Sequence, residues 1–188
     1  MNSFYDKSEL AEIGFKSIGQ DVFISRKASF YCADKMEIGN HVRIDDFCFL
    51  SGNIRLGNHI HLAVGCILYG SEKGITMEDF SGLSPRCVVH ADSDDYSGEF
   101  MTNPMVDKKY TNVTFEPVNI GKHAILGSGC IVLPGVNVGE GSCVGSMSLV
   151  KESTRPWTIN IGIPSKEVKE RSRRLLELEK EFLSNNEG

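Results

Sequence analysis

Residues 38–68 read IGNHVRIDDFCFLSGNIRLGNHIHLAVGCIL, and every sixth residue of this stretch is a branched aliphatic. Four positions after most of these residues stands a second apolar residue, such as Val42, Cys48 or Ile54. A period of six fits neither the 3.6-residue turn of an α-helix nor the simple alternation of an isolated strand. The aliphatic positions are Ile38, Ile44, Leu50, Leu56, Leu62 and Leu68.

Each unit of six therefore consists of a short strand and a corner. Three such sides close one triangular coil, and coils stack at the usual strand spacing of about 4.8 Å. The aliphatic side chains fill the interior, while Gly, Asn and Asp suit the unusual backbone angles of corners. A β-sandwich with coincidental spacing is the alternative, and the run of consecutive matches disfavours it. The register continues at Ile18, Ile24, Phe30, Met77, Leu83, Val89, Ile120, Leu126, Val132, Val138, Val144 and Val150.

The composition is that of a globular protein, with 188 residues, 40% hydrophobic residues and a net charge of −5. The negative charge argues against a broad nucleic-acid surface. No apolar run approaches the roughly 20 residues that cross a bilayer, and the start MNSFYDKSEL lacks the apolar core of a signal peptide. These features predict a cytoplasmic protein without membrane insertion, whose six cysteines stay reduced.

The period divides the chain into three parts. Residues 1–17 form an N-terminal cap, in which Asp6 and Glu9 have the spacing of a helix capping box. Residues 18–164 form the β-helix, interrupted by a polar loop over 91–117 that is too long for a simple connection. Residues 165–188 are predicted to be a C-terminal helix, because Leu175, Glu179 and Phe182 have helical spacing.

The units Ile-Gly-Asn-His-Val at 38–42, Ile-Gly-Lys-His-Ala at 120–124 and Val-Leu-Pro-Gly-Val-Asn-Val-Gly at 132–139 resemble the hexapeptide-repeat acyltransferases. The resemblance covers about residues 18–164. It implies a left-handed coil, a homotrimer, a CoA thioester as donor with acetyl-CoA as the first expectation, and an active site shared by neighbouring subunits. It also implies that the 91–117 loop covers the acceptor.

Acyl transfer needs a base for the acceptor proton, and histidine suits that task at neutral pH. His90 is the first candidate, because it follows the inward Val89 and opens the loop from which the resembled family supplies its histidine. His123 and His61 remain in contention, whereas His41 and His59 are interpreted as surface corners. The residues expected to orient the base or contact the acceptor are Asp92, Asp94, Asp95 and Tyr96.

Residues near the end of the repeat are expected to bind the donor. By resemblance, Ser128 and Ser146 lie in turns that meet the pantetheine arm, and Ile125 stands where the family often packs a Trp on the donor. Gly162-Ile163-Pro164-Ser165-Lys166 is similar to the family's closing motif, which places Lys166 and Lys169 near the CoA phosphates. Lys151 and Arg171 are close enough in sequence to contribute.

The first functional hypothesis is O-acetyl transfer to a sugar of a surface polysaccharide or its precursor. It rests on the stretch 93–98, Ser-Asp-Asp-Tyr-Ser-Gly, which is similar to a subgroup associated with O-antigen genes. N-acetyl transfer to a nucleotide-linked amino sugar is the second hypothesis. A zinc enzyme of the γ-carbonic anhydrase type is disfavoured, because no two histidines are five residues apart, so no metal is predicted. A non-enzymatic scaffold would not require the closing motif or the acidic loop.

Overall fold

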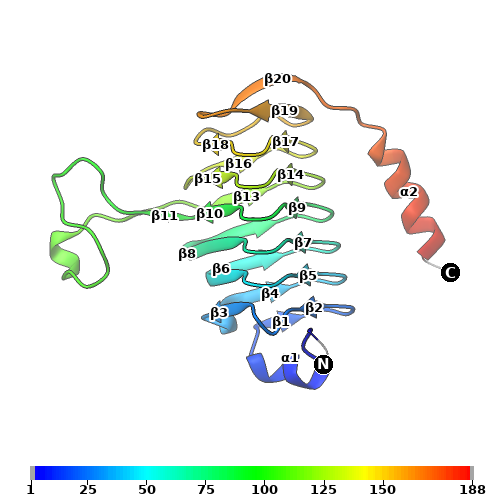
Figure 1. The fold of residues 1–188 in the computed structure, drawn as a ribbon, viewed down its shortest axis with the longest axis horizontal. Helices are drawn as coiled ribbons and strands as arrows, with labels where there is room; N and C mark the ends of the chain where they lie inside the picture. Colours follow the sequence, from blue (N-terminus) through cyan, green and yellow to red (C-terminus); the bar gives the residue numbers. More distant parts are fainter. Residues whose placement is uncertain (1–2, 187–188) are drawn as a thin grey trace.

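The computed structural model describes residues 3–186 and shows a three-sided prism of short stacked strands (Figure 1). A helix, α1 (Lys7–Ile13), lies below the lowest coil, and a second helix, α2 (Leu175–Asn186), follows the highest one. A long loop projects from the middle of the prism. This arrangement confirms the predicted left-handed parallel β-helix with a short N-terminal helix, an excursion loop and a C-terminal helix.

Face 1 of the prism is an eight-stranded sheet in which all neighbours except the last pair are parallel. Its strands are β2 (Phe23–Ile24), β5 (Arg43–Ile44), β7 (His61–Leu62), β9 (Gly82–Leu83), β14 (Ile125–Leu126), β17 (Cys143–Val144), β19 (Thr158–Ile161) and β20 (Lys166–Glu170).

Faces 2 and 3 share the long strands β6 (Phe49–Leu56) and β8 (Ile67–Met77), which bend around the corner between them. Face 2 also contains β3 (Ser29–Tyr31), β10 (Val88–His90), β15 (Ile131–Val132) and β18 (Leu149–Val150). Face 3 also contains β1 (Ser17–Ile18), β4 (Met36–Ile38), β13 (Val118–Ile120) and β16 (Asn137–Val138).

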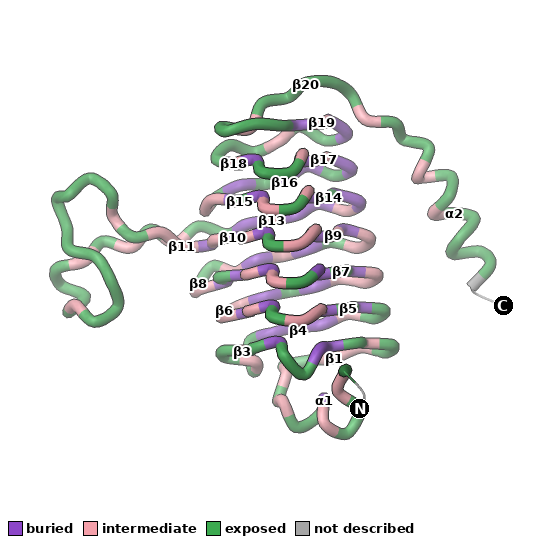
Figure 2. The backbone as a smooth tube through the Cα atoms, viewed as in Figure 1, coloured by how far each residue is buried: buried purple, intermediate pink, exposed green. Residues whose placement is uncertain are grey.

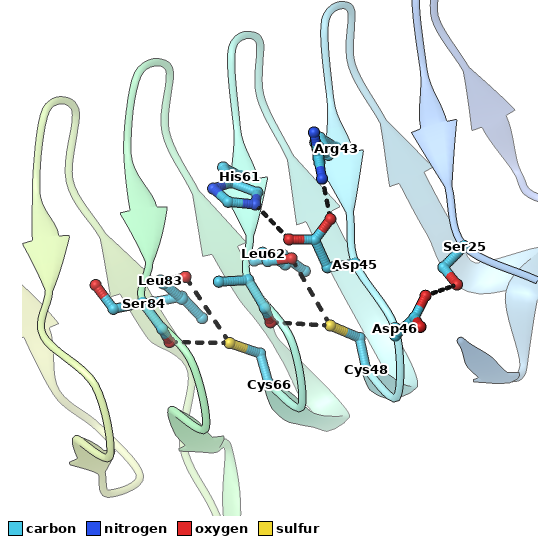
Figure 3. Close-up of polar contacts among 11 residues, drawn as sticks. Ser25, Arg43, Asp45, Asp46, Cys48, His61, Leu62, Cys66, Leu83 and Ser84 are labelled. Atoms are coloured by element: carbon cyan, nitrogen blue, oxygen red, sulfur yellow. Dashed lines mark hydrogen bonds and ion pairs between the residues drawn. The ribbon is translucent and has the colours of Figure 1, made fainter. Parts of the chain in front are cut away.

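The interior holds the residues of the six-residue period. Figure 2 shows the buried positions alternating with accessible ones along each coil, and Leu50, Leu62 and Leu68 have no exposed surface. Burying one such side chain contributes roughly 1.5–3 kcal/mol. A column of four buried cysteines, Cys48, Cys66, Cys87 and Cys130, occupies the second inward position. Their thiols donate to carbonyls of the next coil, as Cys66 Sγ does to the Ser84 oxygen at 3.2 Å (Figure 3).

The outward positions differ sharply between the faces. Face 2 carries the apolar column Phe49, Ile67, Val88, Ile131 and Leu149. Face 3 carries the polar column Glu37, Arg55, Thr76, Asn119 and Asn137. Asn119 Nδ2 donates to Glu78 at 3.1 Å and to Asn137 at 3.2 Å, so the polar column is linked from coil to coil.

Both ends of the prism are closed by local structure. Asp6 caps α1 by accepting from the Ser8 and Glu9 amides, while Glu9 accepts from the Asp6 amide, which completes the expected capping box. At the other end β20 pairs antiparallel with β19 and covers its free edge. The helix predicted to begin at 165 therefore begins at Leu175, because the open edge of β19 binds residues 166–170 as a strand first. The proposed boundaries at 17/18 and 164/165 stay a prediction.

The long loop leaves the corner between faces 2 and 3. Its stem is the antiparallel pair β11 (Asp92–Ser93) and β12 (Thr114–Phe115), and its tip contains the 3₁₀ turn Lys108–Tyr110. Figure 1 shows that the loop extends well away from the prism instead of folding back over a face of the same chain.

Candidate functional site

A cavity of about 540 Å³ lies where the loop joins face 2. His90 stands at the end of β10, and its ring stacks on Tyr69 of the coil below, with centroids 5.1 Å apart and planes 15° from parallel. The structure thus brings together the first predicted base and three predicted acceptor residues. The polar and aromatic lining residues are Tyr69, His90, Asp92, Asp94, Tyr96, Asn103, Lys108, Thr111 and Phe115.

Partial burial adjusts the protonation of the two groups at the mouth of the loop. It lowers the pKa of His90 below its ordinary 6.5, although Asp92 acts in the opposite direction. Burial also raises the pKa of Asp92, opposed by His90. The neutral imidazole, which is the form that accepts a proton, is therefore favoured at neutral pH.

Asp95, another predicted acceptor residue, accepts hydrogen bonds from its own loop. Its carboxylate accepts from the Ser97 amide at 3.0 Å, the Gly98 amide at 3.1 Å and the Ser97 hydroxyl at 2.8 Å. These hydrogen bonds lower its pKa and hold the turn that follows. Tyr96 borders the cavity but is 93% exposed, so its ring is available to a partner.

His61, the third predicted histidine, lies on a different face. Its Nε2 is 2.8 Å from Oδ2 of Asp45, and Oδ1 of the same carboxylate accepts from Nε of Arg43 at 2.7 Å (Figure 3). Partial burial acts to raise the pKa of Asp45, but the hydrogen bonds from Arg43 and His61 outweigh it and lower that pKa. Asp45 therefore orients His61 and leaves the imidazole Nδ1 without a hydrogen-bond partner among residues 3–186.

A second cavity, of about 420 Å³, lies on face 1 beside His61. Its floor is β9, and its walls come from β14, from the corner between faces 3 and 1, and from the segment that leads into α2. Two of the predicted histidines and one predicted donor residue border it. The main lining residues are His59, His61, Ala63, Phe80, Gly82, Ser84, His123, Ile125, Arg171 and Leu175.

His123 belongs to an aromatic column at that corner. His41, His59, Phe80 and His123 occupy equivalent left-handed positions, with φ of 55°, 57°, 60° and 59°. Consecutive rings are stacked 4.6–5.2 Å apart. His41 and His59 are therefore corner residues, as their repeat position indicated.

Helix α2 packs on the same corner. His123 is 9% exposed, and its Nε2 lies 2.8 Å from Oε2 of Glu179, whose other oxygen is 2.6 Å from Nζ of Lys122. Phe182 meets the His59 ring edge-on at 5.3 Å. Nε2 of His123 is engaged in the hydrogen bond with Glu179. His123 therefore anchors helix α2 in this conformation.

The predicted donor residues follow the upper half of the prism. Ile125 is 41% exposed on β14, whereas Ser128 and Ser146 lie in the turns between faces 1 and 2. Lys166 and Lys169 are exposed on β20 and have no ion pair among the described residues. Arg171 instead donates to the carbonyls of His123 at 2.9 Å and Gly141 at 2.8 Å, so it fastens the chain before α2.

Residues 3–186 contain no group of three or more His, Cys, Asp or Glu side chains that could hold a metal ion. Within the same residues no helix has the length and apolar character needed to cross a membrane.

No family model matches the sequence. A curated relative, the dTDP-4-amino-4,6-dideoxy-D-glucose acyltransferase of Escherichia coli, is 46% identical over 183 residues, which covers 96% of this chain and 95% of the relative. The chain belongs to the hexapeptide-repeat acyltransferases. It is an acyltransferase.

Solved structures of family members agree with this assignment. AntD, an N-acyltransferase from Bacillus cereus in complex with dTDP and 3-hydroxybutyryl-CoA, is 47% identical with a TM-score of 0.98, and the match covers 100% of both chains. A Ser-to-Cys variant of that enzyme, in complex with dTDP-4-amino-4,6-dideoxyglucose and coenzyme A, has a TM-score of 0.96 over 98% of this chain and 99% of the other. A galactoside acetyltransferase shares the fold alone, at 18% identity and a TM-score of 0.57 over 89% of this chain and 71% of the other.

These relatives overturn the first functional hypothesis. O-acetylation of a polysaccharide sugar is wrong, because the relatives that match nearly the whole chain act on an amino sugar linked to dTDP. The stretch 93–98 misled the interpretation because a loop rich in Asp and Ser suits an amine as well as a hydroxyl. The second hypothesis, N-acyl transfer to a nucleotide-linked amino sugar, is the better supported one.

Tyr69 and Asp45 were missed by the sequence analysis. In regular coils the vertical neighbour lies 18 residues away, as Asn58 does from Asn40. Tyr69 and His90 are 21 residues apart, because β8 carries extra residues around its corner. Asp45 and His61 are 16 apart, which is the spacing of diagonal neighbours. A search for polar pairs at diagonal spacing would have found the second pair.

Proposed function

We propose that this enzyme transfers an acyl group from a CoA thioester to the amine of a dTDP-linked 4-amino-4,6-dideoxy sugar. The near end-to-end match to relatives of that activity carries the proposal. The cavity beside the loop adds physical support, because a histidine in its neutral form and two acidic residues are gathered there.

An amine acceptor gives those acidic residues a role. A sugar amine is largely protonated at neutral pH, so the carboxylates of Asp92 and Asp94 would attract it into the cavity. His90 is the proposed base: it accepts a proton from the nitrogen, which then attacks the thioester carbonyl. An amide bond forms and the C–S bond breaks. Of the two protons that the ammonium group loses, one goes to His90 and the other to the departing sulfur, which leaves as CoA thiol.

The donor would lie along face 1 and the adjacent turns. Ile125 offers an apolar surface to the pantetheine arm, and the turns at Ser128 and Ser146 offer backbone groups to its amides. Lys166 and Lys169, both exposed on β20, are proposed to meet the CoA phosphates.

We also propose a homotrimer. The acceptor cavity is on face 2 and the proposed donor surface is on face 1, so one prism cannot bring both to the same point. The apolar column of face 2 and the exposed Phe47 and Met147, 64% and 68% exposed at the corner between faces 1 and 2, would be buried if that corner faced a threefold axis. The polar face 3 would then face solvent.

Both proposed substrates are cytoplasmic metabolites, so we propose that the enzyme works in the cytoplasm.

The direct test is a thiol-release assay with the purified enzyme. Acetyl-CoA and 3-hydroxybutyryl-CoA are each combined with dTDP-4-amino-4,6-dideoxyglucose, with dTDP-glucose, or with the free amino sugar. The expected result is rapid release with the dTDP-linked amino sugar and at least a hundredfold slower release with the other two. Equal rates with dTDP-glucose would contradict amine acylation.

A further inference from the structure

The outward column of face 1 has a gap at one coil. The members of this column, one from each of the strands β5, β7, β9, β14 and β17, are Arg43, His61, Gly82, Ile125 and Cys143. Gly82 is the member of that series without a side chain. A notch one side chain deep therefore lies between His61 below and Ile125 above, and it forms part of the 420 Å³ cavity.

Nothing in the backbone requires glycine at this position. Gly82 lies in a strand and is not among the positive-φ residues of the described chain. A Cβ added there would meet only the His61 carbonyl oxygen, at 3.6 Å, which is an ordinary contact. Gly39 and Gly57 differ, because a Cβ on Gly39 would clash with the Gly57 carbonyl oxygen and a Cβ on Gly57 would clash with the Asp79 carboxylate. The fold therefore does not explain the glycine at position 82.

The lining of the notch suits a short acyl chain. Ala63 and Ile125 supply apolar surface, and Ser84 supplies a hydroxyl at the edge. His61, fixed by Asp45, leaves its Nδ1 available for a hydrogen bond to the acyl group (Figure 3). A chain of about four carbons that carries a hydroxyl group could use both kinds of surface, whereas an acetyl group would leave the notch partly empty.

We propose that the notch over Gly82 binds the acyl group of the donor, and that the absence of a side chain at Gly82 allows acyl groups longer than acetyl. This inference rests on the proposed function, because it concerns the donor of that reaction. It also replaces the default expectation of acetyl with a four-carbon hydroxyacyl group as the preferred substrate class.

Filling the notch provides the test. Gly82→Ala and Gly82→Val are compared with the unmodified enzyme, using acetyl-CoA, butyryl-CoA and 3-hydroxybutyryl-CoA with the dTDP-linked amino sugar. Discrimination by one methylene group typically amounts to roughly 10–200-fold in kcat/KM. We expect Gly82→Val to lower kcat/KM for both four-carbon donors at least tenfold, while kcat/KM for acetyl-CoA changes less than threefold. Gly82→Ala should lower kcat/KM for the four-carbon donors by an intermediate factor.

Thr76→Val is the matched control, because Thr76 holds an outward position on the polar face 3, away from the notch. It should leave the acyl preference unchanged. Thermal unfolding of each variant reports whether the prism remains intact. If folded Gly82→Val keeps the acyl preference of the unmodified enzyme, or loses kcat/KM equally with all three donors, the notch is not the acyl site. Either result leaves the proposed function unaffected. Absence of turnover by the unmodified enzyme with every donor would overturn the proposed function itself.

Discussion

His90, the proposed base, is held in place by its neighbours along the prism. The His90 ring stacks on Tyr69, and the Tyr69 ring in turn packs against Phe49, with ring centroids 5.5 Å apart. The position is partly buried, so its pKa falls below 6.5. The proposed base is therefore neutral near pH 7 and would need no prior deprotonation before it accepts a proton.

The pH profile of the enzyme should reflect this lowered pKa. Because the neutral ring is the active form, kcat/KM should decrease as pH falls through the pKa of His90, with a midpoint below 6.5. His90→Asn should lower kcat/KM roughly a hundredfold or more and remove that acidic limb. His41→Asn is the control, since His41 is an exposed corner residue and Asn tolerates its φ of 55°. A normal profile in His90→Asn would exclude His90 as the base.

The corner between faces 3 and 1 is the element that joins the prism to the C-terminal helix. The aromatic column continues above His123 to Trp157, whose ring lies over the intervening Gly141. Arg171 donates to the carbonyls of His123 and Gly141, and Arg173 lies 5.6 Å above the Trp157 ring. The helix therefore depends on this corner for its position, and it borders the face 1 cavity through Leu175.

Gly141 should be indispensable to that corner. It has a φ of 63°, and a Cβ there would lie 2.5 Å from the Trp157 ring. Gly141→Ala therefore combines a left-handed strain of roughly 1–2 kcal/mol with overpacking of roughly 1–3 kcal/mol. Gly98→Ala is the control, because its φ of 84° imposes similar strain with nothing within 4 Å of the new Cβ. The free energy of unfolding of both variants is measured by chemical denaturation. If Gly141→Ala and Gly98→Ala lose equal amounts, the predicted clash with the Trp157 ring is refuted.

The attachment of α2 should weaken in acid. Burial acts to raise the pKa of Glu179, but the hydrogen bonds from Lys122 and His123 outweigh it and lower that pKa below the ordinary 4.5. A carboxyl with a lowered pKa stabilises the folded contact above pH 4.5, and this stabilisation disappears as pH falls through the lower, folded-state value. The helix should therefore remain docked near neutral pH and detach only in strong acid.

The single tryptophan, Trp157, reports on this contact because it is 5% exposed at the same corner. We expect its emission to shift to longer wavelength as the helix detaches at low pH, and Glu179→Gln to show part of that shift already at pH 7. Glu181→Gln, two residues further along and exposed, should behave like the unmodified enzyme. A pH response unaffected by Glu179→Gln would contradict the role of that carboxylate.

At the scale of the whole molecule, the three faces have different chemistry although they share one interior. Face 2 presents an apolar column, face 1 a mixed one with the notch at Gly82, and face 3 a polar one. An interior repeat places no constraint on outward residues, so this difference needs another cause. The proposed assembly through faces 1 and 2, with face 3 in solvent, would account for this difference between the faces.

Ile131→Glu should disrupt that assembly. Ile131 is 39% exposed in the apolar column, and a carboxylate buried there against a neighbouring subunit would remain unpaired. We expect sedimentation analysis to show dissociation toward monomers together with loss of acyl transfer. Asn137→Glu on face 3 should remain trimeric and active, because the new carboxylate keeps an acceptor for Asn119 and stays in solvent. A trimer in both variants would contradict the proposed interface.

The six-residue period was enough to predict a three-sided stack of coils, because burial of an aliphatic residue such as Leu50 or Leu62 depends only on its place in the coil. The left-handed winding of the coils was predicted from the family resemblance. The capping box at Asp6 and the corner positions of His41 and His59 were equally local and equally predictable.

Contacts between coils were decided by the tertiary structure. The stacking of Tyr69 on His90, the pairing of Asp45 with His61, and the attachment of Glu179 to His123 join residues 21, 16 and 56 positions apart. Insertions at corners change the number of residues per coil, so the sequence does not show which outward side chains become neighbours. The shape of the cavities follows from those neighbours, and for that reason the notch at Gly82 became visible only in the folded prism.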